Sequence, residues 1–158
     1  MRPTWDEYFM SITKEAAKRS TCDRKNVGAV VVKDNRVVAT GYNGSPRGAP
    51  HCDEAGHLLK NIDGRDSCVR TIHAECNTIM HAREDLKGAT IYSSCFPCLE
   101  CMKCIINVGI ARVYYDEYYG SRMTDEAFNL GLNAGLIIST RGLSLKFTDQ
   151  GARNGKNL

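Results

Sequence analysis

The chain has 158 residues, of which 42% are hydrophobic and 25% charged, and its formal net charge at pH 7 is +3. These values are typical of one globular domain, and without a long Lys/Arg stripe they favour a small anionic substrate over nucleic acid. Because no signal core or membrane-length apolar run occurs, we expect a cytoplasmic protein without a membrane partner, in which eight Cys indicate metal binding or catalysis before disulfides.

The first predicted element is an amphipathic helix. Thr4 and Glu7 have the spacing of a capping box, which begins a helix by satisfying its first N–H groups. Apolar residues then recur at helical spacing, namely Trp5, Tyr8, Phe9, Ile12 and Ala16. We expect this aromatic stripe to face a sheet.

A β-hairpin is predicted next. The β-branched run at 27–32, the turn at 33–35 and the return at 36–42 are typical of two antiparallel strands. Residues 43–67 then form a long polar segment with several Gly and Pro and no period. A loop of this length in a compact domain is usually functional or held by a local constraint.

The second half alternates helices and strands. Helices are predicted at 73–83, 98–108 and 124–133, and strands at 89–93, 111–115 and 135–139. The whole order indicates an α/β fold, a single-domain α/β/α sandwich with a mixed five-stranded sheet and right-handed crossovers in its second half. We expect this domain to cover residues 1–140 and a loose polar tail to cover 141–158.

Two short motifs carry the chemistry. His73 precedes Glu75 by two residues, and Cys98 and Cys101 follow a proline as Pro-Cys-x-x-Cys. One imidazole and two thiolates are ligands that Zn²⁺ prefers, and three protein ligands leave the fourth position open for water, which then ionises near neutral pH. Glu75 would act as the catalytic acid and base, taking a proton from that water and passing it to a cytosine ring nitrogen and then to ammonia. The two motifs together are the signature of zinc nucleobase deaminases.

The wider cysteine row permits another reading. Cys95, Cys98, Cys101 and Cys104 follow one another at three-residue steps, as some iron–sulfur ligands do. The last spacing and the lack of a following proline differ from the iron–sulfur pattern. If residues 98–108 are helical, Cys104 also lies one turn beyond Cys101, away from the metal, so zinc is preferred. Both motifs fall at predicted strand-to-helix junctions, where the helix dipole favours thiolates. Cys76 is expected to be a buried small hydrophobe.

Several further stretches resemble one known family. They are Arg-Ser-Thr-Cys at 19–22, Val-Gly-Ala-Val-Val at 27–31, Gly-Tyr-Asn-Gly-Ser-Pro at 41–46, His-Cys at 51–52, and the residues around both motifs at 68–75 and 96–98. Over about residues 5–140 the chain resembles the cytidine deaminase superfamily and, within it, the deoxycytidylate (dCMP) deaminases. The Gly-Tyr-Asn-Gly segment is the more specific marker. Thr78 stands where relatives favour a smaller residue.

The resemblance implies an activity and an assembly. It implies hydrolysis of dCMP to dUMP and ammonia, which feeds thymidylate synthesis. It also implies a homo-oligomer, commonly a hexamer, that dCTP with Mg²⁺ activates and dTTP inhibits. Neither the effectors nor the oligomer is visible in the residues themselves.

Substrate contacts are expected at four positions. By the resemblance, Asn43 would bind the sugar 3′-hydroxyl and Tyr119 would close over the nucleotide. Arg24 and Lys25 precede the first strand and are the candidates for the 5′-phosphate, which a bidentate guanidinium suits well. The alternatives are a turn role for Asn43 beside Gly44 and a solvated surface pair for the two cations.

A second metal site is expected beside the long loop. Cys22, Cys52 and Cys68 flank this loop, and His51 and His57 lie within it. Three thiolates and one imidazole make a closed structural zinc site, which would hold a loop that lacks secondary structure. The resemblance favours His57 over His51. The alternative is a set of free buried thiols.

Other functions stay open at this point. A related deaminase could act on cytidine, on an adenosine of transfer RNA or on a pteridine-like precursor, although a transfer-RNA enzyme would show a broader basic face. A non-catalytic zinc scaffold is a rival of a different class. The scaffold is disfavoured by Glu75, because metal binding alone does not need that carboxylate.

Overall fold

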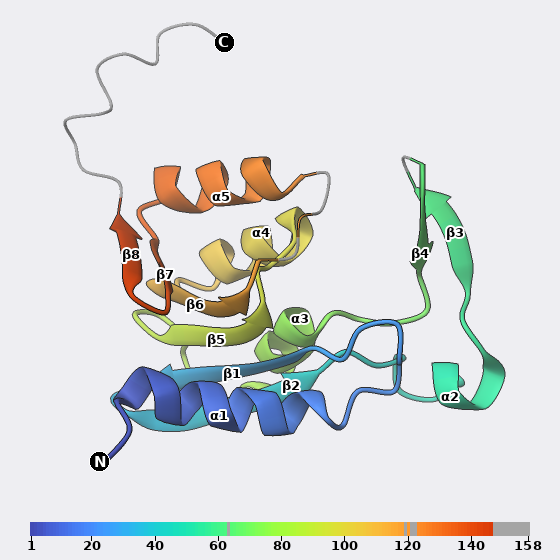
Figure 1. The fold of residues 1–158 in the computed structure, drawn as a ribbon, viewed down its shortest axis with the longest axis horizontal. Helices are drawn as coiled ribbons and strands as arrows, with labels where there is room; N and C mark the ends of the chain where they lie inside the picture. The colour runs from blue at the N-terminus through green and yellow to red at the C-terminus, as the bar shows by residue number, and fades with distance from the viewer. Residues whose placement is uncertain (63, 119, 121–122, 147–158) are drawn as a thin grey trace, which may run out of the picture.

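The structure, a computed structural model, describes residues 1–62, 64–118, 120 and 123–146. Its centre is a six-stranded mixed sheet in the order β2-β1-β5-β6-β7-β8 (Figure 1). The strands are β1 (Gly28–Lys33), β2 (Arg36–Tyr42), β5 (Thr90–Cys95), β6 (Arg112–Glu117), β7 (Ile137–Thr140) and β8 (Leu143–Lys146). β5, β6 and β7 run parallel, and the remaining neighbours pair antiparallel. The predicted mixed α/β sheet is confirmed, with one strand more than expected.

The additional strand lies in the segment expected to be a loose tail. β8 pairs antiparallel with β7 after a turn at Gly142, whose φ is +75°. All four of its residues are exposed, so its alternating leucines give only a weak strand pattern. The tail prediction is wrong for residues 143–146, and residues 147–158 lie outside the described part of the chain.

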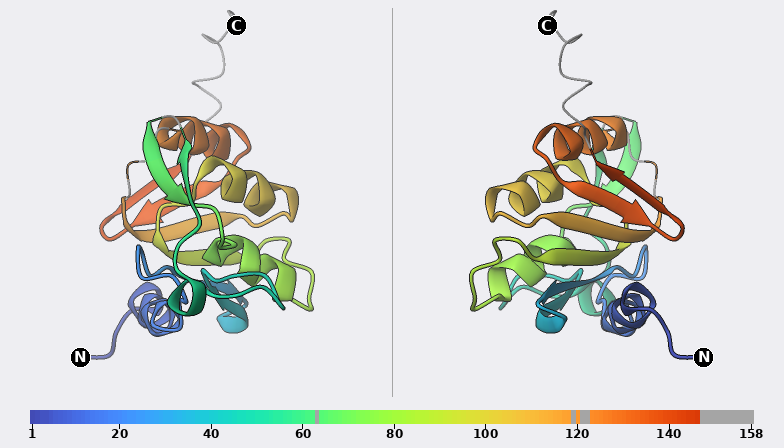
Figure 2. Two further views of the ribbon diagram at one scale, coloured as in Figure 1. Left: turned by 90° about the vertical axis from the view of Figure 1, so that its right-hand side faces the viewer. Right: turned by 90° about the vertical axis from the view of Figure 1, so that its left-hand side faces the viewer.

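Helices cover both faces of the sheet (Figure 2). α1 (Trp5–Ala17) lies on one face, and α3 (Ala74–His81), α4 (Leu99–Asn107) and α5 (Thr124–Asn133) lie on the other. Alternate strand residues feed the two cores: Val30, Val32, Tyr92 and Tyr114 on the α1 side, and Val31, Ile91, Val113 and Ile138 on the other. This is the predicted α/β/α sandwich. In the described residues, no helix is both long and apolar enough to span a bilayer.

The face of α1 that packs against the sheet differs from the expected aromatic stripe. Trp5 and Tyr8 are 58% and 46% exposed, whereas Phe9 and Thr13 are buried. The reason is a close approach to β1 at Gly28, where a Cβ would stand only 2.5 Å from the backbone nitrogen of Ala17. This approach turns the residue 9–13–17 side of the helix toward the sheet. The aromatic rings at its N-terminal end remain at the rim.

The segment expected to be one long loop contains three short elements. They are α2 (Cys52–Ala55), β3 (Leu59–Ile62) and β4 (Arg65–Cys68). β3 and β4 pair as an antiparallel hairpin that stands apart from the main sheet in Figure 1. The prediction of a structureless loop is wrong here, because four-residue strands with mostly polar side chains leave no period to read.

A partly buried ion pair joins α1 to the middle of the sheet. The guanidinium of Arg112 donates to both carboxylate oxygens of Asp6 at 2.8 and 2.9 Å, and the Tyr92 hydroxyl donates to the same carboxylate at 2.7 Å. Burial pushes the pKa of Asp6 up, but the bonds from Arg112 and Tyr92 outweigh it, so the pKa is lowered. The pair therefore stabilises the fold wherever Asp6 is ionised.

We expect Asp6→Asn to lower the free energy of unfolding by about 1.5–3 kcal/mol at neutral pH, the usual contribution of hydrogen bonds to a charged group. Because the folded pKa is lowered, the stabilisation is complete above the unfolded pKa of about 4 and is lost as pH falls through the folded pKa. Urea unfolding at several pH values measures the difference. Glu15→Gln, in an exposed pair on the same helix, is the control and should change little. Equal stability of Asp6→Asn and the unaltered chain at pH 7 would contradict this role.

Candidate functional site

The N-termini of α3 and α4 meet at one end of the central strands of the sheet. His73 and Cys98 are the N-cap residues of these helices, both with extended backbone. The place of α3 depends on Gly41 of β2, where a Cβ would stand 2.8 Å from the backbone nitrogen of Thr78. The larger Thr78 is accommodated because its hydroxyl donates to the Ala74 carbonyl at 2.7 Å and faces this glycine.

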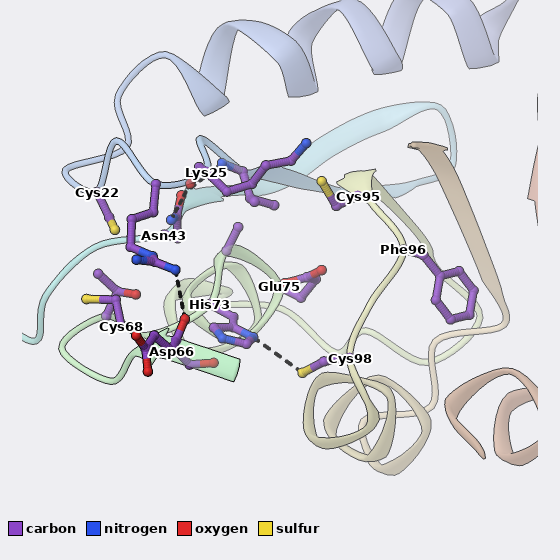
Figure 3. Close-up of a pocket in the computed structure, with 15 residues that line it drawn as sticks. Cys22, Lys25, Asn43, Asp66, Cys68, His73, Glu75, Cys95, Phe96 and Cys98 are labelled. Atoms are coloured by element: carbon purple, nitrogen blue, oxygen red, sulfur yellow. Dashed lines mark hydrogen bonds between the residues drawn. The ribbon is translucent and has the colours of Figure 1, made fainter. Parts of the chain in front are cut away.

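The three predicted zinc ligands come together at this end of the strands. The ligand atoms of His73, Cys98 and Cys101 lie within 4.8 Å of one another. Nδ1 of His73 is 3.3 Å from Sγ of Cys98, a contact drawn in Figure 3, and 3.5 Å from Sγ of Cys101. Tetrahedral zinc bonds of usual length would separate such N and S atoms by about 3.6 Å. The residues present therefore fit a zinc ion with three protein ligands.

Hydrogen bonds in and around this group lower the pKa values of two thiols. The hydrogen bond with Cys101 and, against burial, the one with His73 lower the pKa of Cys98 to about 4. Cys76 lies 3.6 Å from Cys101, sulfur to sulfur, and this contact lowers the pKa of Cys76 to about 7. Cys76 is only partly buried, so the expectation of a fully buried thiol is wrong. A metal ligand must be deprotonated, which the position of Cys98 favours.

Glu75 lies in the first turn of α3, next to the ligand group. Its side chain is buried, with 4% exposure, yet it lines the pocket that His73 and Cys98 also line. Oε1 accepts a hydrogen bond of 3.0 Å from the Ser93 hydroxyl. Burial raises the pKa of this carboxyl. A buried carboxyl beside a metal-ligand group can both accept and donate a proton near neutral pH.

A second group of possible ligands forms where the sequence predicts it. The ligand atoms of Cys22, Cys52, His57 and Cys68 lie within 4.8 Å of one another. The sulfurs of Cys52 and Cys68 are 3.6 Å apart, and Cys22 Sγ is 3.7 Å from Nδ1 of His57. These separations again suit tetrahedral zinc with four protein ligands, which is the closed arrangement of structural sites.

The choice between the two loop histidines follows from their partners. His57 Nε2 lies 3.0 Å from a carboxylate oxygen of Asp23, so that its Nδ1 faces the sulfurs. A carboxylate on the far nitrogen is the usual support of a zinc-binding histidine. His51 instead places Nδ1 3.0 Å from the Thr21 hydroxyl and is not a member of the group.

One pocket of about 320 Å³ separates the two groups. Figure 3 shows Cys22 and Cys68 at one end and His73, Glu75 and Cys98 at the other. The volume and the mixed lining are those of a site for a small molecule. The pocket is thus a single concave site that is lined by members of both predicted ligand groups.

The predicted substrate-binding residues line the same pocket. Arg24 donates to the backbone carbonyl of Asp66 at 2.7 Å, and Lys25 bonds to a carboxylate oxygen of Glu117 at 2.6 Å. Asn43 is buried, accepts from the Val27 N–H at 2.9 Å and donates to the Lys25 carbonyl at 2.8 Å. Its amide therefore holds the cation-bearing loop. Tyr119 lies outside the described residues.

Four residues near the site are not in the predicted set. Asp66 and Cys95 line the pocket, Asp23 supports His57, and Ser93 supports Glu75. Ser93 alone leaves a readable signal, since a polar residue interrupts the apolar side of a buried strand. Cys95 ends β5, whereas the positions of Asp23 and Asp66 depend on how the loops and the hairpin meet in space, which spacing does not reveal.

Comparison with known proteins agrees with this arrangement. Residues 3–117 match the model of the cytidine and deoxycytidylate deaminase zinc-binding region. The chain is 47% identical over 121 residues to ComE operon protein 2 of Bacillus subtilis, covering 75% of this chain and 62% of that protein. It is 42% identical over 143 residues to deoxycytidylate deaminase of Saccharomyces cerevisiae, covering 87% and 45%, and 47% identical over 123 residues to that of Mycobacterium phage D29, covering 72% and 95%. The matched segment thus spans less than two thirds of the Bacillus and yeast proteins.

Solved structures show the same fold. The dCMP deaminase of cyanophage S-TIM5, solved in complex with dCMP and dUMP, has a TM-score of 0.72 at 29% identity and covers 89% of this chain and 98% of that one. A diaminohydroxyphosphoribosylaminopyrimidine deaminase/reductase of Thermotoga maritima has a TM-score of 0.63 at 28% identity, covering 86% of this chain but 36% of that one. By the match of its sequence and by its fold, the chain belongs to the cytidine and deoxycytidylate deaminase family.

Proposed function

We propose that this chain is a zinc-dependent deaminase that hydrolyses dCMP to dUMP and ammonia. The observation that carries the proposal is the convergence of the His73, Cys98 and Cys101 ligand atoms, with His73 and Cys98 lining the same pocket as buried Glu75. The names of the yeast and phage relatives and the nucleotides bound by the S-TIM5 enzyme support dCMP as the substrate.

The side chains divide the chemistry between them. His73, Cys98 and Cys101 would hold a zinc ion, which when bound would supply a Lewis acid for activating water near neutral pH. Glu75 accepts the proton of the attacking water and delivers it to the ring nitrogen next to the reacting carbon. Glu75 then takes the proton of the hydroxyl now on the ring carbon and transfers it to the amino group, so that the C–N bond breaks, the carbonyl of the product forms and ammonia leaves. The raised pKa of Glu75 suits a group that must both take and give protons.

The cations of the pocket suit a nucleotide phosphate. Arg24 and Lys25 line it and carry the positive charge that the 5′-phosphate needs. Arg24 has further N–H donors besides the one bonded to Asp66. Asn43 would meet the sugar hydroxyl while holding the backbone of the cation-bearing loop.

The second ligand group would hold a structural zinc ion. Cys22, Cys52, His57 and Cys68 come from four separate segments, so one ion would join them. Such a site stabilises short elements that bury little apolar surface. We further infer the finer properties that the family resemblance implies: a hexamer, activation by dCTP with Mg²⁺, inhibition by dTTP, and a cytoplasmic location. These remain predictions, as does the single deaminase domain, although its expected end at residue 140 leaves out β8.

A different nucleobase is the alternative substrate. The likeness to the Thermotoga deaminase shows that the same fold also occurs in a protein named for another pyrimidine. Ammonia release from cytidine, from dCMP and from a pyrimidine ribosyl phosphate distinguishes these activities. Turnover of another base without dCMP turnover would replace the proposal.

Replacing Glu75 by Gln should lower kcat for dCMP by roughly 10²–10⁴-fold, the usual contribution of a general acid and base. Zinc content, measured by atomic absorption, should be unchanged because Glu75 is not a ligand. Glu100→Gln, an exposed residue of α4 paired with Lys103, is the matched control and should keep its activity. Near-normal turnover of Glu75→Gln would contradict the assigned role.

Replacing Cys52 by Ser should lower the zinc content from about two ions to about one per chain, because a closed site needs all four ligands. The temperature of unfolding should fall in the same variant. Cys104→Ser is the control, since Cys104 is exposed and belongs to neither ligand group. An unchanged zinc content in Cys52→Ser would show that the second group holds no metal.

A further inference from the structure

Ser93 occupies an unusual position in the central sheet. It lies in β5 on the same side as Ile91, which belongs to the apolar core beneath α3 and α4. Its exposure is 0%. A buried hydroxyl at a core position costs free energy unless it is hydrogen-bonded, so its partner indicates why it is there.

The partner of Ser93 is the carboxylate of Glu75. The Ser93 hydroxyl has one proton, which it donates to Oε1 at 3.0 Å. Among the described residues, it is the one side chain that donates a hydrogen bond to this carboxylate. The donor is fixed, because Ser93 is paired with Ala29 of β1 on one side and with Tyr115 of β6 on the other.

This bond restricts the one soft torsion of the carboxylate. The terminal torsion of a glutamate has a broad, roughly two-fold profile and is not held by rotamer preference. The backbone N–H of Glu75 also bonds to this carboxylate, but Oε1 is the oxygen bonded to the sheet, so Oε2 is the candidate for the pocket that Glu75 lines. A proton carried by this residue therefore resides on Oε2, where it can be passed to a molecule in the pocket.

We propose that Ser93 is a positioning residue, which orients the Glu75 carboxyl so that Oε2 faces the reacting atoms. The inference rests on the proposed deaminase function and adds a residue that acts through Glu75 without touching the substrate. Since both proton transfers use the same oxygen, a rotated carboxyl slows the chemical step and leaves substrate binding intact. The effect should thus fall on kcat and spare KM.

The test compares three variants of the zinc-loaded full chain with dCMP as substrate. Ser93→Ala removes the hydroxyl and little volume, and Ser93→Thr keeps the hydroxyl. Ser139→Ala is the matched control, because Ser139 is an equally buried serine of the same sheet whose hydroxyl bonds to Arg112 and Ser144. Zinc content and the temperature of unfolding are measured for each.

Ser93→Ala should lose about 10- to 100-fold in kcat, as expected for a misplaced catalytic group, with KM changed by less than about twofold. Ser93→Thr should keep most of the activity, and Ser139→Ala should match the unaltered chain. A normal kcat for Ser93→Ala, an equal loss in Ser139→Ala, or an equally slow, zinc-loaded Ser93→Thr would overturn the inference. If Ser93→Thr fails to fold, the kcat and KM of Ser93→Ala decide alone. Failure of the unaltered chain to release ammonia from dCMP would instead overturn the proposed function, and with it this role.

Discussion

The approach of two helix N-termini to each other at the end of the central strands is the constraint on which the site depends. His73 and Cys98 cap α3 and α4 there, so both ligands stand where the helix dipoles favour negative charge. α3 can pack this closely on the sheet only because Gly41 has no side chain to collide with Thr78. The hydrogen bond from Ser93 of β5 to Glu75 connects the reactive carboxyl to a strand that is paired on both sides.

The other wall of the pocket is built on a different principle. α2, β3 and β4 bury little apolar surface, and Leu59 and Ile62 of the hairpin are largely exposed. A hydrophobic core cannot hold such a segment in place. Four converging ligand residues can, because binding one ion would join the loop before β1 to α2 and to the end of β4. The loop with Arg24 and Lys25 begins at one of these ligands, Cys22, so the same group fixes where the cations lie.

The sequence predicts the parts of this molecule that have a strong period or a fixed ligand spacing. The β1–β2 hairpin, the β5–α4–β6 unit and both ligand groups follow from such patterns, whereas the choice of His57 as the loop histidine follows from the family resemblance. The patterns fail where the cause is a contact between distant segments. The close approach at Gly28 leaves Trp5 exposed, and the polar strands β3, β4 and β8 pair without an apolar period. Asp23 and Asp66 are invisible in the sequence for the same reason, because only the folded loop brings them to the site.

The central claim is that one pocket both deaminates a cytosine and reads its 5′-phosphate. The most direct measurement is kcat/KM for ammonia release from dCMP and from deoxycytidine, which differ only in the phosphate. The account predicts a preference for dCMP of at least about 100-fold, because a site built to bind a charged group discriminates strongly against its absence. Equal values for the two compounds would contradict it and would remove Arg24 and Lys25 from substrate recognition.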